Sequence, residues 1–212
     1  LLDGWNVRLY DPDPEIARKT EAVLKNARAA QAGLMQDAPL PAEGGISYAG
    51  SIAEAVAGAD FIQESLPERE DLKIRVLAEI DAAAPPETVI GSSTSGLLPS
   101  RLQSGMSRPE RLVVGHPFNP VYLLPLVEIC GGEKTSEAAC EAAAEVYRSI
   151  GMKPLRVRKE IDGFIADRLL EALWREALWL VNDGVATVEE IDDAVRYGAG
   201  LRWSFMGTFL TY

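Results

Sequence analysis

The sequence of 212 residues is long enough for one large domain or a domain and a half, and its 47% hydrophobic and 25% charged residues are ordinary for a globular protein. A formal net charge of −11 argues against a nucleic-acid or anionic-membrane surface, because both need clustered lysine and arginine. Two cysteines and one histidine are too few for a disulfide framework or a zinc site, and no apolar run reaches the roughly 18 residues of a membrane helix.

The N-terminal residues do not have the pattern of a signal peptide. The chain opens with Leu1-Leu2-Asp3-Gly4, without Met and without the charged segment that begins such a peptide. We therefore expect a protein of the reducing cytoplasm. The opening is typical of the last turn of a helix with Gly4 as its C-cap, so we also expect the sequence to start inside a domain.

Strands and helices alternate over the first 160 residues. Strands are expected at residues 6–11, 46–48, 61–64, 89–92, 112–116, 123–128 and 153–157. Helical patterns begin at Pro14, Ser51, Glu68, Pro99 and Ser136. Ser51 and Glu54 have the spacing of a capping box. Residues 37–45, rich in proline and glycine, are expected to form a loop. This alternation predicts an α/β fold, a doubly wound, Rossmann-like and mainly parallel sheet covered on both faces.

The pattern becomes all-helical near residues 158–162. A long helix is expected from Asp162 to Asp183, and Thr187 to Glu190 is a capping box that opens another. We therefore expect a Rossmann-like domain at 1–160 and a helical domain at 161–212. The larger aromatic residues include Phe118, Tyr122, Trp174, Trp179, Trp203 and Phe205. Burial statistics predict that most of them belong to the core. A subset near a site would bind a quaternary ammonium group by cation–π contacts.

Asp11 ends the first expected strand. An acid at the end of the second strand of a doubly wound sheet hydrogen-bonds the ribose of NAD and opposes the 2′-phosphate of NADP. The alternative is a helix-capping aspartate. The glycine-rich turn of such a unit lies roughly 20 residues before the acid. The sequence does not contain this turn, so we expect it to lack the first strand and the glycine loop of the fold.

Polar residues also follow two later strands. Glu68 and Lys73 come after the strand at 61–64, and Ser95 comes after the strand at 89–92. Ligands bind at the carboxyl ends of parallel strands, so these side chains are candidates for ligand contacts. The alternatives are a solvated first helical turn for Glu68 and Lys73, and a simple polar turn for Ser95.

The single histidine, His116, ends the strand at 112–116, and Glu128 lies on the strand that follows. A carboxylate that orients an imidazole creates a general base. The alternative is a buried histidine bonded to a backbone carbonyl. Because four strand ends direct polar groups to one edge, we favour a base that takes a hydroxyl proton while a hydride leaves the same carbon for a nicotinamide.

Several motifs resemble the 3-hydroxyacyl-CoA dehydrogenase family, most closely its carnitine dehydrogenase branch. The most specific is His-x-Phe-Asn-Pro at 116–120 with the downstream Val-Glu at 127–128, and it is supported by residues 92–97, 162–170 and 198–203. The resemblance covers almost the whole chain. Intact members of the family have the first strand, the glycine loop and a longer helical domain, so the resemblance implies that both ends of the sequence are truncated.

The resemblance also implies roles for individual residues. His116 is similar to the family's catalytic base, Glu128 to its partner, and Ser95 to the serine that bonds the substrate's 3-oxygen and touches the nicotinamide. The implied cofactor is NAD, with contacts from Asp11, Leu66, Glu68, Lys73, Ser95 and Asn119. The implied quaternary state is a homodimer formed through the helical domain.

One departure from the family pattern points to the substrate. Asp167 stands where acyl-CoA enzymes have asparagine, and a carboxylate there favours a cation such as the trimethylammonium of carnitine. Ser95, Phe118, Asp167 and Trp174 are then the expected substrate contacts, with Arg202 a candidate for the carboxylate; the alternative for Asp167 is an ion pair with a neighbouring arginine. The expected reaction is NAD-dependent oxidation of L-carnitine to 3-dehydrocarnitine. The alternatives are a 3-hydroxybutyryl-CoA or L-gulonate dehydrogenase, or a non-catalytic binding or structural fragment.

Overall fold

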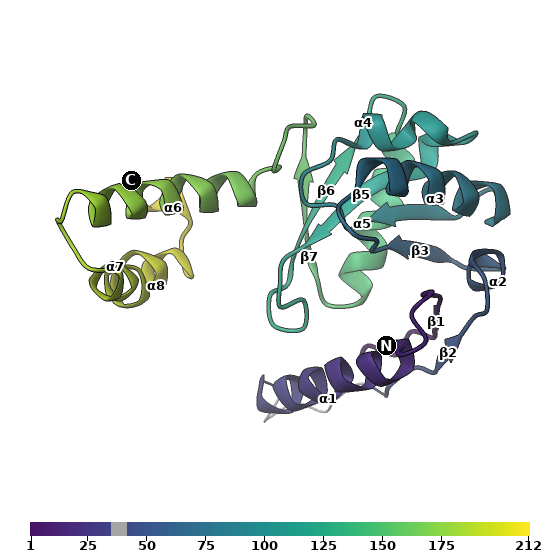
Figure 1. Cartoon of the computed structure of the whole chain (residues 1–212), viewed down its shortest axis with the longest axis horizontal. Helices are drawn as coiled ribbons and strands as arrows, with labels where there is room; N and C mark the ends of the chain where they lie inside the picture. Colours follow the sequence, from purple (N-terminus) through teal and green to yellow (C-terminus); the bar gives the residue numbers. More distant parts are fainter. Residues whose placement is uncertain (35–41) are drawn as a thin grey trace. The chain divides into compact units, whose positions relative to one another are not determined.

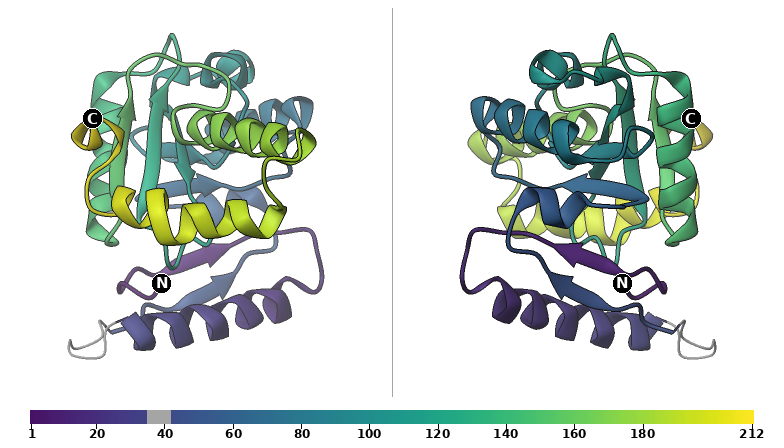
Figure 2. Two further views of the ribbon diagram at one scale, coloured as in Figure 1. Left: turned by 90° about the vertical axis from the view of Figure 1, so that its left-hand side faces the viewer. Right: turned by 90° about the vertical axis from the view of Figure 1, so that its right-hand side faces the viewer.

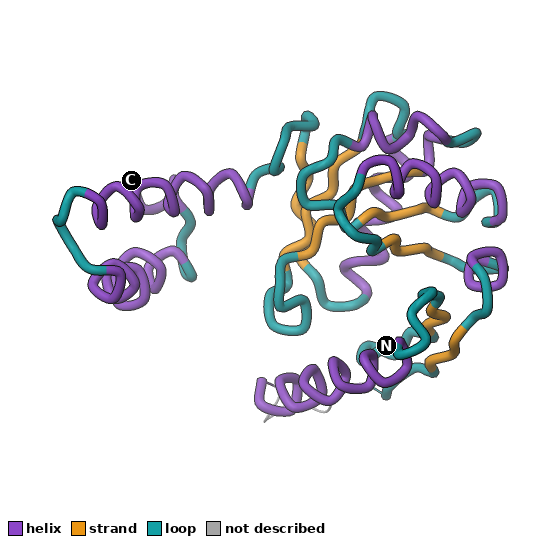
Figure 3. Tube along the Cα trace, viewed as in Figure 1, coloured by secondary structure: helices purple, strands orange, loops and turns teal. Residues whose placement is uncertain are grey.

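The structure, a computed structural model, describes residues 1–34 and 42–212, so the expected loop at 37–45 lies partly outside the described residues. The chain divides into two compact units, Leu1–Phe164 and Ile165–Tyr212 (Figure 1). The first contains all the strands of the described residues, and the second consists of helices and their connections (Figure 3).

A five-stranded sheet forms the centre of the first unit. Its strands lie side by side in chain order: β3 (Phe61–Glu64), β4 (Val89–Ser92), β5 (Leu112–Pro117), β6 (Leu126–Gly131) and β7 (Lys153–Val157). Neighbouring strands are parallel except β5 and β6, which are antiparallel. Their connection at 118–125 is too short for the crossover that a parallel pair needs. The mainly parallel α/β sheet expected from the sequence is confirmed.

Helices cover both faces of this sheet. Helix α5 (Glu137–Ser149) packs on one face against Val113 and Val127, and α3 (Glu70–Ala83) packs on the other against Ile90 and Leu112. Successive residues of a strand point to opposite faces, so Leu112 and Val113 belong to different core clusters. The second face is completed by α4 (Pro99–Leu102) and the 3₁₀ turns at Gln103–Gly105 and Pro109–Arg111.

Strands β1 (Val7–Leu9) and β2 (Ile46–Tyr48) form a separate parallel pair, joined by α1 (Ile16–Leu34), which runs alongside them in Figure 2. The sheet of the described residues is therefore in two pieces, whereas the sequence pattern predicted one. Arg8 ties β1 to α2 (Ile52–Val56) by donating hydrogen bonds to the carbonyls of Glu54 at 2.9 Å and Ala57 at 2.8 Å. All three residues of β2 are exposed, unlike the buried strand β4.

Two helix starts differ from the sequence-based expectation. Ser51 caps α2 as expected, but Glu54 accepts from the Gly50 amide at 2.7 Å and does not complete a capping box. The long helix α6 begins at Ala166 instead of Asp162. Gly163 and Phe164 have φ angles of 71° and 46°, and this left-handed backbone cannot continue into a helix.

The second unit contains α6 (Ala166–Asn182), α7 (Val188–Ala194), a π-helical turn (Val195–Ala199), α8 (Gly200–Trp203) and α9 (Thr208–Thr211). Thr187 and Glu190 form the expected capping box at α7. None of residues 165–212 is buried, and Trp174, Trp179 and Phe205 are 60%, 58% and 83% exposed. The expectation that these aromatic residues belong to a core is wrong, because helices this few and short cannot enclose one by themselves.

Candidate active site

His116 and Glu128 meet across the antiparallel pair β5–β6. They are register partners, so their side chains project from the same face of the sheet. His116 Nδ1 lies 3.0 Å from Glu128 Oε2. Glu128 is completely buried and His116 is 7% exposed. The imidazole is therefore held by a carboxylate, as expected, and the alternative of a ring held by a backbone carbonyl does not describe the contact at Nδ1.

Two phenylalanine rings enclose the imidazole. The centroids of Phe118 and Phe164 each lie 5.7 Å from the His116 ring centroid, Phe118 edge-on and Phe164 tilted. Phe164 is fully buried with Val114, Cys130 and Val157. Its φ of 46° is unfavourable for a residue with a Cβ. Burial of the ring against this cluster offsets that cost and seats the ring beside the imidazole.

A cavity of about 320 Å³ opens beside His116. Its lining comes from three consecutive loops at the carboxyl ends of β3, β4 and β5: Ser65, Ser93, Ser95, His116, Pro117, Asn119 and Val121. The structure thus brings together Ser95, His116 and Asn119, three of the residues that the sequence singled out. Apart from His116, the described residues that line the cavity carry no ionisable side chain.

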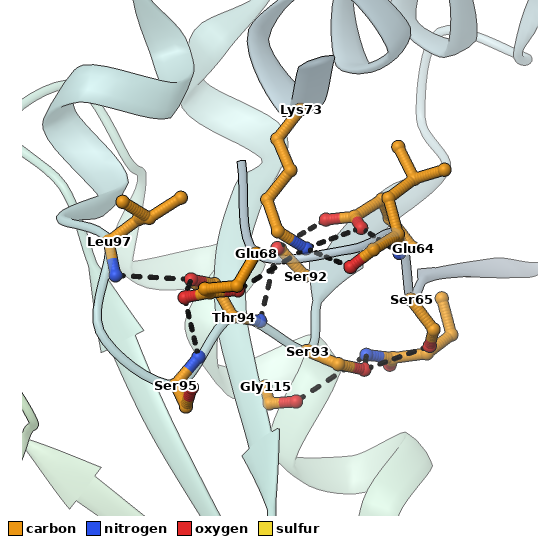
Figure 4. Close-up of polar contacts among 12 residues, drawn as sticks. Glu64, Ser65, Glu68, Lys73, Ser92, Ser93, Thr94, Ser95, Leu97 and Gly115 are labelled. Carbon is orange, nitrogen blue, oxygen red and sulfur yellow. Dashed lines mark hydrogen bonds and ion pairs between the residues drawn. The ribbon is translucent and has the colours of Figure 1, made fainter. Parts of the chain in front are cut away.

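A buried ion pair ties two of these loops together (Figure 4). Lys73 Nζ lies 2.7 Å from Glu64 Oε1 and donates to the Leu66 carbonyl at 2.9 Å. The other Glu64 oxygen accepts the Ser92 hydroxyl at 2.5 Å. Both side chains of the ion pair are only 1% exposed. Lys73 therefore holds the loop after β3 to the end of β4, and its ammonium group is enclosed by protein.

Glu68 braces the loop that carries Ser95. Its Oε1 accepts the Thr94 hydroxyl and the backbone amides of Ser95 at 3.1 Å and Gly96 at 3.0 Å (Figure 4). Partial burial acts to raise the pKa of Glu68, but these hydrogen bonds and the charge of Lys73 hold that pKa below its usual value. The alternative of a solvated first helical turn is wrong for Lys73, whose side chain is 1% exposed, whereas Glu68 is 41% exposed and lies just before α3.

Other residues singled out by the sequence are not among the residues that line the cavity. Asp11 is exposed after β1, and its Oδ1 accepts the Asp13 amide at 2.8 Å. Leu66 follows β3 but is not among the lining residues. Asp167 and Trp174 belong to α6 in the second unit.

The sequence-based prediction missed Ser65 and Ser93 at the cavity, and Gln63 and Tyr147, which are connected to Ser93 by hydrogen bonds. Gln63 Nε2 donates to Ser93 Oγ at 2.7 Å, and Tyr147 donates to Gln63 Oε1 at 2.6 Å. The available signal was glycine inside two buried strands, Gly91 and Gly115. Such glycines often mark the close approach of another group, which here is the Tyr147 hydroxyl.

No helix in the part of the chain that the structure describes is long and apolar enough to cross a membrane. Among the same residues, no group of three or more His, Cys, Asp or Glu side chains is placed to hold a metal ion.

Comparison with known proteins defines the class. Residues 1–161 match the NAD-binding domain of 3-hydroxyacyl-CoA dehydrogenases, and residues 163–212 match the C-terminal domain of the same enzymes. The chain belongs to the 3-hydroxyacyl-CoA dehydrogenase family.

Among characterised relatives, the chain is similar to L-carnitine dehydrogenases. It is 62% identical to the one from Mesorhizobium japonicum and 61% identical to the one from Pseudomonas aeruginosa, over its whole length in both cases. It spans 58% and 66% of the length of these two proteins.

Solved structures give the same fold. An NAD⁺-dependent 5-formyl-3-hydroxy-2-methylpyridine-4-carboxylic acid 5-dehydrogenase superposes with a TM-score of 0.90 at 33% identity, covering 99% of this chain and 68% of that one. A 3-hydroxybutyryl-CoA dehydrogenase from Escherichia coli superposes with a TM-score of 0.81 at 29% identity, covering 93% of this chain and 42% of that one.

Proposed function

We propose that this chain carries the catalytic base of an NAD-dependent L-carnitine dehydrogenase, which oxidises the 3-hydroxyl of L-carnitine to 3-dehydrocarnitine. The observation that carries the reaction type is the His116–Glu128 pair beside a cavity that Ser95 also lines. The choice of substrate is supported by relatives of that name at 62% and 61% identity.

The proposed base works through its two ring nitrogens. Glu128 accepts the Nδ1 proton of His116, so Nε2 carries the basic lone pair. Nε2 then takes the proton of the substrate hydroxyl, and the buried carboxylate stabilises the imidazolium that forms. Ser95 donates a hydrogen bond to the same substrate oxygen. Bound NAD supplies the acceptor for the hydride that leaves C3.

The residues present fit NAD. The exposed Asp11 carboxylate follows a parallel strand, which suits the hydroxyls of a ribose and opposes a 2′-phosphate. Ser95 and Asn119 offer hydrogen-bonding groups at the cavity, where the nicotinamide would lie. We assign Glu68 and Lys73 an indirect part, because they hold the loops that carry Ser95 and Leu66.

The second unit supplies the proposed recognition of the cation. Asp167 in the first turn of α6 and Trp174 on the same helix would bind the trimethylammonium group through charge and cation–π contacts. Exposed apolar side chains along α6, including Leu169 at 60% and Leu170 at 53%, support pairing with a second copy of the chain. Light scattering of the purified protein tests this pairing, and a monomeric mass contradicts it.

Turnover with three substrates tests the proposed function. The full-length protein should form NADH with L-carnitine and little with 3-hydroxybutyryl-CoA or L-gulonate. Activity with either of those alone would contradict the substrate and keep the reaction type. No NADH with any of the three would favour the non-catalytic alternative.

A further inference from the structure

A chain of hydrogen bonds runs along the face of the five-stranded sheet that α5 covers and ends at the cavity. The Tyr147 hydroxyl donates to Gln63 Oε1 at 2.6 Å, and Gln63 Nε2 donates to Ser93 Oγ at 2.7 Å. Ser93 Oγ lies 3.0 Å from Ser65 Oγ (Figure 4). Both serines line the cavity beside His116. The buried end of the chain is therefore connected to two hydroxyls at the site.

Two strands have glycine where this chain of hydrogen bonds passes. A Cβ on Gly115 would lie 1.8 Å from the Tyr147 hydroxyl oxygen. A Cβ on Gly91 would lie 2.8 Å from both that oxygen and Gln63 Oε1. Tyr147 is 5% exposed, and its ring meets Phe61 edge-on at 5.5 Å. The two glycines thus leave space on the α5 face of the buried strands β4 and β5 for the Tyr147 hydroxyl and the Gln63 amide.

The direction of each hydrogen bond follows from its neighbours. Burial raises the pKa of Tyr147, so its phenol stays protonated and donates. Gln63 Nε2 also lies 3.4 Å from the Gly115 carbonyl, which only accepts. A flipped amide would set two carbonyl oxygens against each other, so Gln63 must turn its NH₂ group toward Ser93.

This direction fixes what the serines offer. Ser93 Oγ accepts from Gln63, so its own hydrogen points to Ser65 or into the cavity. If the Ser93 hydroxyl donates to Ser65 Oγ, then Ser65 is the acceptor and its own hydroxyl hydrogen points away from Ser93. In both cases the pair has a hydroxyl hydrogen left to donate at the cavity, next to His116.

We propose that Tyr147 and Gln63 are positioning residues that make the Ser93–Ser65 pair a hydrogen-bond donor to an acceptor oxygen of the bound ligand. The identity of that oxygen rests on the proposed function: it belongs to the carboxylate of the substrate or to the carboxamide of the nicotinamide. Neutral hydroxyls suit either, since apart from His116 the described lining carries no ionisable side chain. A hydrogen bond to a carboxylate would be charge-assisted and the stronger of the two.

Steady-state kinetics of the full-length enzyme with Tyr147→Phe, Ser93→Ala and the double variant test the proposal. Ser93→Ala should raise the KM of one ligand by about 10-fold, as expected for one lost hydrogen bond to a ligand. Tyr147→Phe should raise the same KM by a smaller factor and add nothing in the Ser93→Ala background. A rise for L-carnitine assigns the carboxylate, and a rise for NAD assigns the carboxamide.

Tyr197→Phe is the matched control, because that hydroxyl belongs to a residue 71% exposed in the second unit. Two outcomes would overturn the proposal. In the first, the fold-changes in KM caused by Tyr147→Phe and Ser93→Ala multiply in the double variant. In the second, Tyr147→Phe lowers the melting midpoint but leaves both KM values unchanged. Calorimetric titration of NAD, and of L-carnitine into NADH-loaded enzyme, gives the same comparison without turnover. A wild type that binds both but does not oxidise carnitine would therefore contradict only the proposed function.

Discussion

Residues 1–164 bury charged side chains such as Lys73, Glu64 and Glu128, whereas none of residues 165–212 is buried and Phe209 is 97% exposed. Among the described residues, every buried side-chain nitrogen or oxygen has a hydrogen-bond partner. The first unit therefore holds its polar groups in one fixed arrangement, which general base chemistry needs. The apolar side chains of the second unit are exposed and are available to pack against another protein surface. Equivalent substitutions in the two units should consequently have very different effects.

The largest difference is expected for catalysis. Glu128→Gln keeps the size of the side chain, but its amide can donate to Nδ1 and so move the imidazole proton to Nε2, where the base is needed. By analogy with the loss of an orienting aspartate, kcat should fall by about 10⁴-fold. Glu176→Gln on the exposed part of α6 should leave kcat unchanged. Equal kcat values for the two variants would contradict the role of Glu128.

The next difference concerns stability. Lys73→Met leaves Glu64 buried without its cation and should lower the free energy of unfolding by about 3–5 kcal/mol. Arg196→Met removes an exposed partner of Asp193, 4.0 Å away, and should cost less than about 1 kcal/mol. Urea unfolding of both variants measures the contrast, and a Lys73→Met protein as stable as Arg196→Met would break it.

The pH dependence of the unfolding free energy should give a smaller contrast between the two units. Burial acts to raise the pKa of Asp81, but hydrogen bonds from Arg111 and from the amides of Arg108 and Ser107 hold it below its usual value. A lowered pKa in the folded state stabilises the protein above the unfolded pKa of about 3.9, and this stabilisation is lost as pH falls through the folded pKa. Unfolding free energies measured from pH 6 downward should fall in wild type. Asp81→Asn should be less stable at pH 6 and should decline less with acid, while Asp193→Asn should follow wild type.

The smallest effect concerns thiol chemistry in the first unit. Burial raises the pKa of Cys130 to about 12, so almost none of it is thiolate at pH 8. Iodoacetamide should modify Cys130 only after denaturation and should leave activity intact. Rapid labelling of Cys130 in the native protein, detected by peptide mass spectrometry, would show that this part of the core opens.

Much of the first unit could be predicted from the sequence because its pattern is local. Strand, turn and helix alternate clearly, and polar residues at strand ends pointed to Ser95 and His116. The contact between His116 and Glu128 required only that two neighbouring strands be antiparallel.

The rest depended on contacts between distant residues. Glu68-Arg69-Glu70-Asp71 has the composition of a solvated turn, yet the nearby Lys73 is buried because Glu64 and the Leu66 carbonyl bind its ammonium group. Tyr147 and Gln63 are 84 residues apart, and only the packed sheet brings them together. The exposed aromatic residues of the second unit misled the prediction because composition gives burial on average and does not show which surfaces meet.

The central claim is that His116 is the base, and His116→Ala tests it most directly. We expect the rate of L-carnitine oxidation to fall by about 10²–10⁴-fold, the range typical of a lost general base. Because His116 is not among the residues that we propose to contact NAD, the affinity for NAD measured by calorimetry should stay close to that of wild type and report an intact fold. A His116→Ala enzyme that binds NAD and oxidises L-carnitine at the wild-type rate would contradict the account.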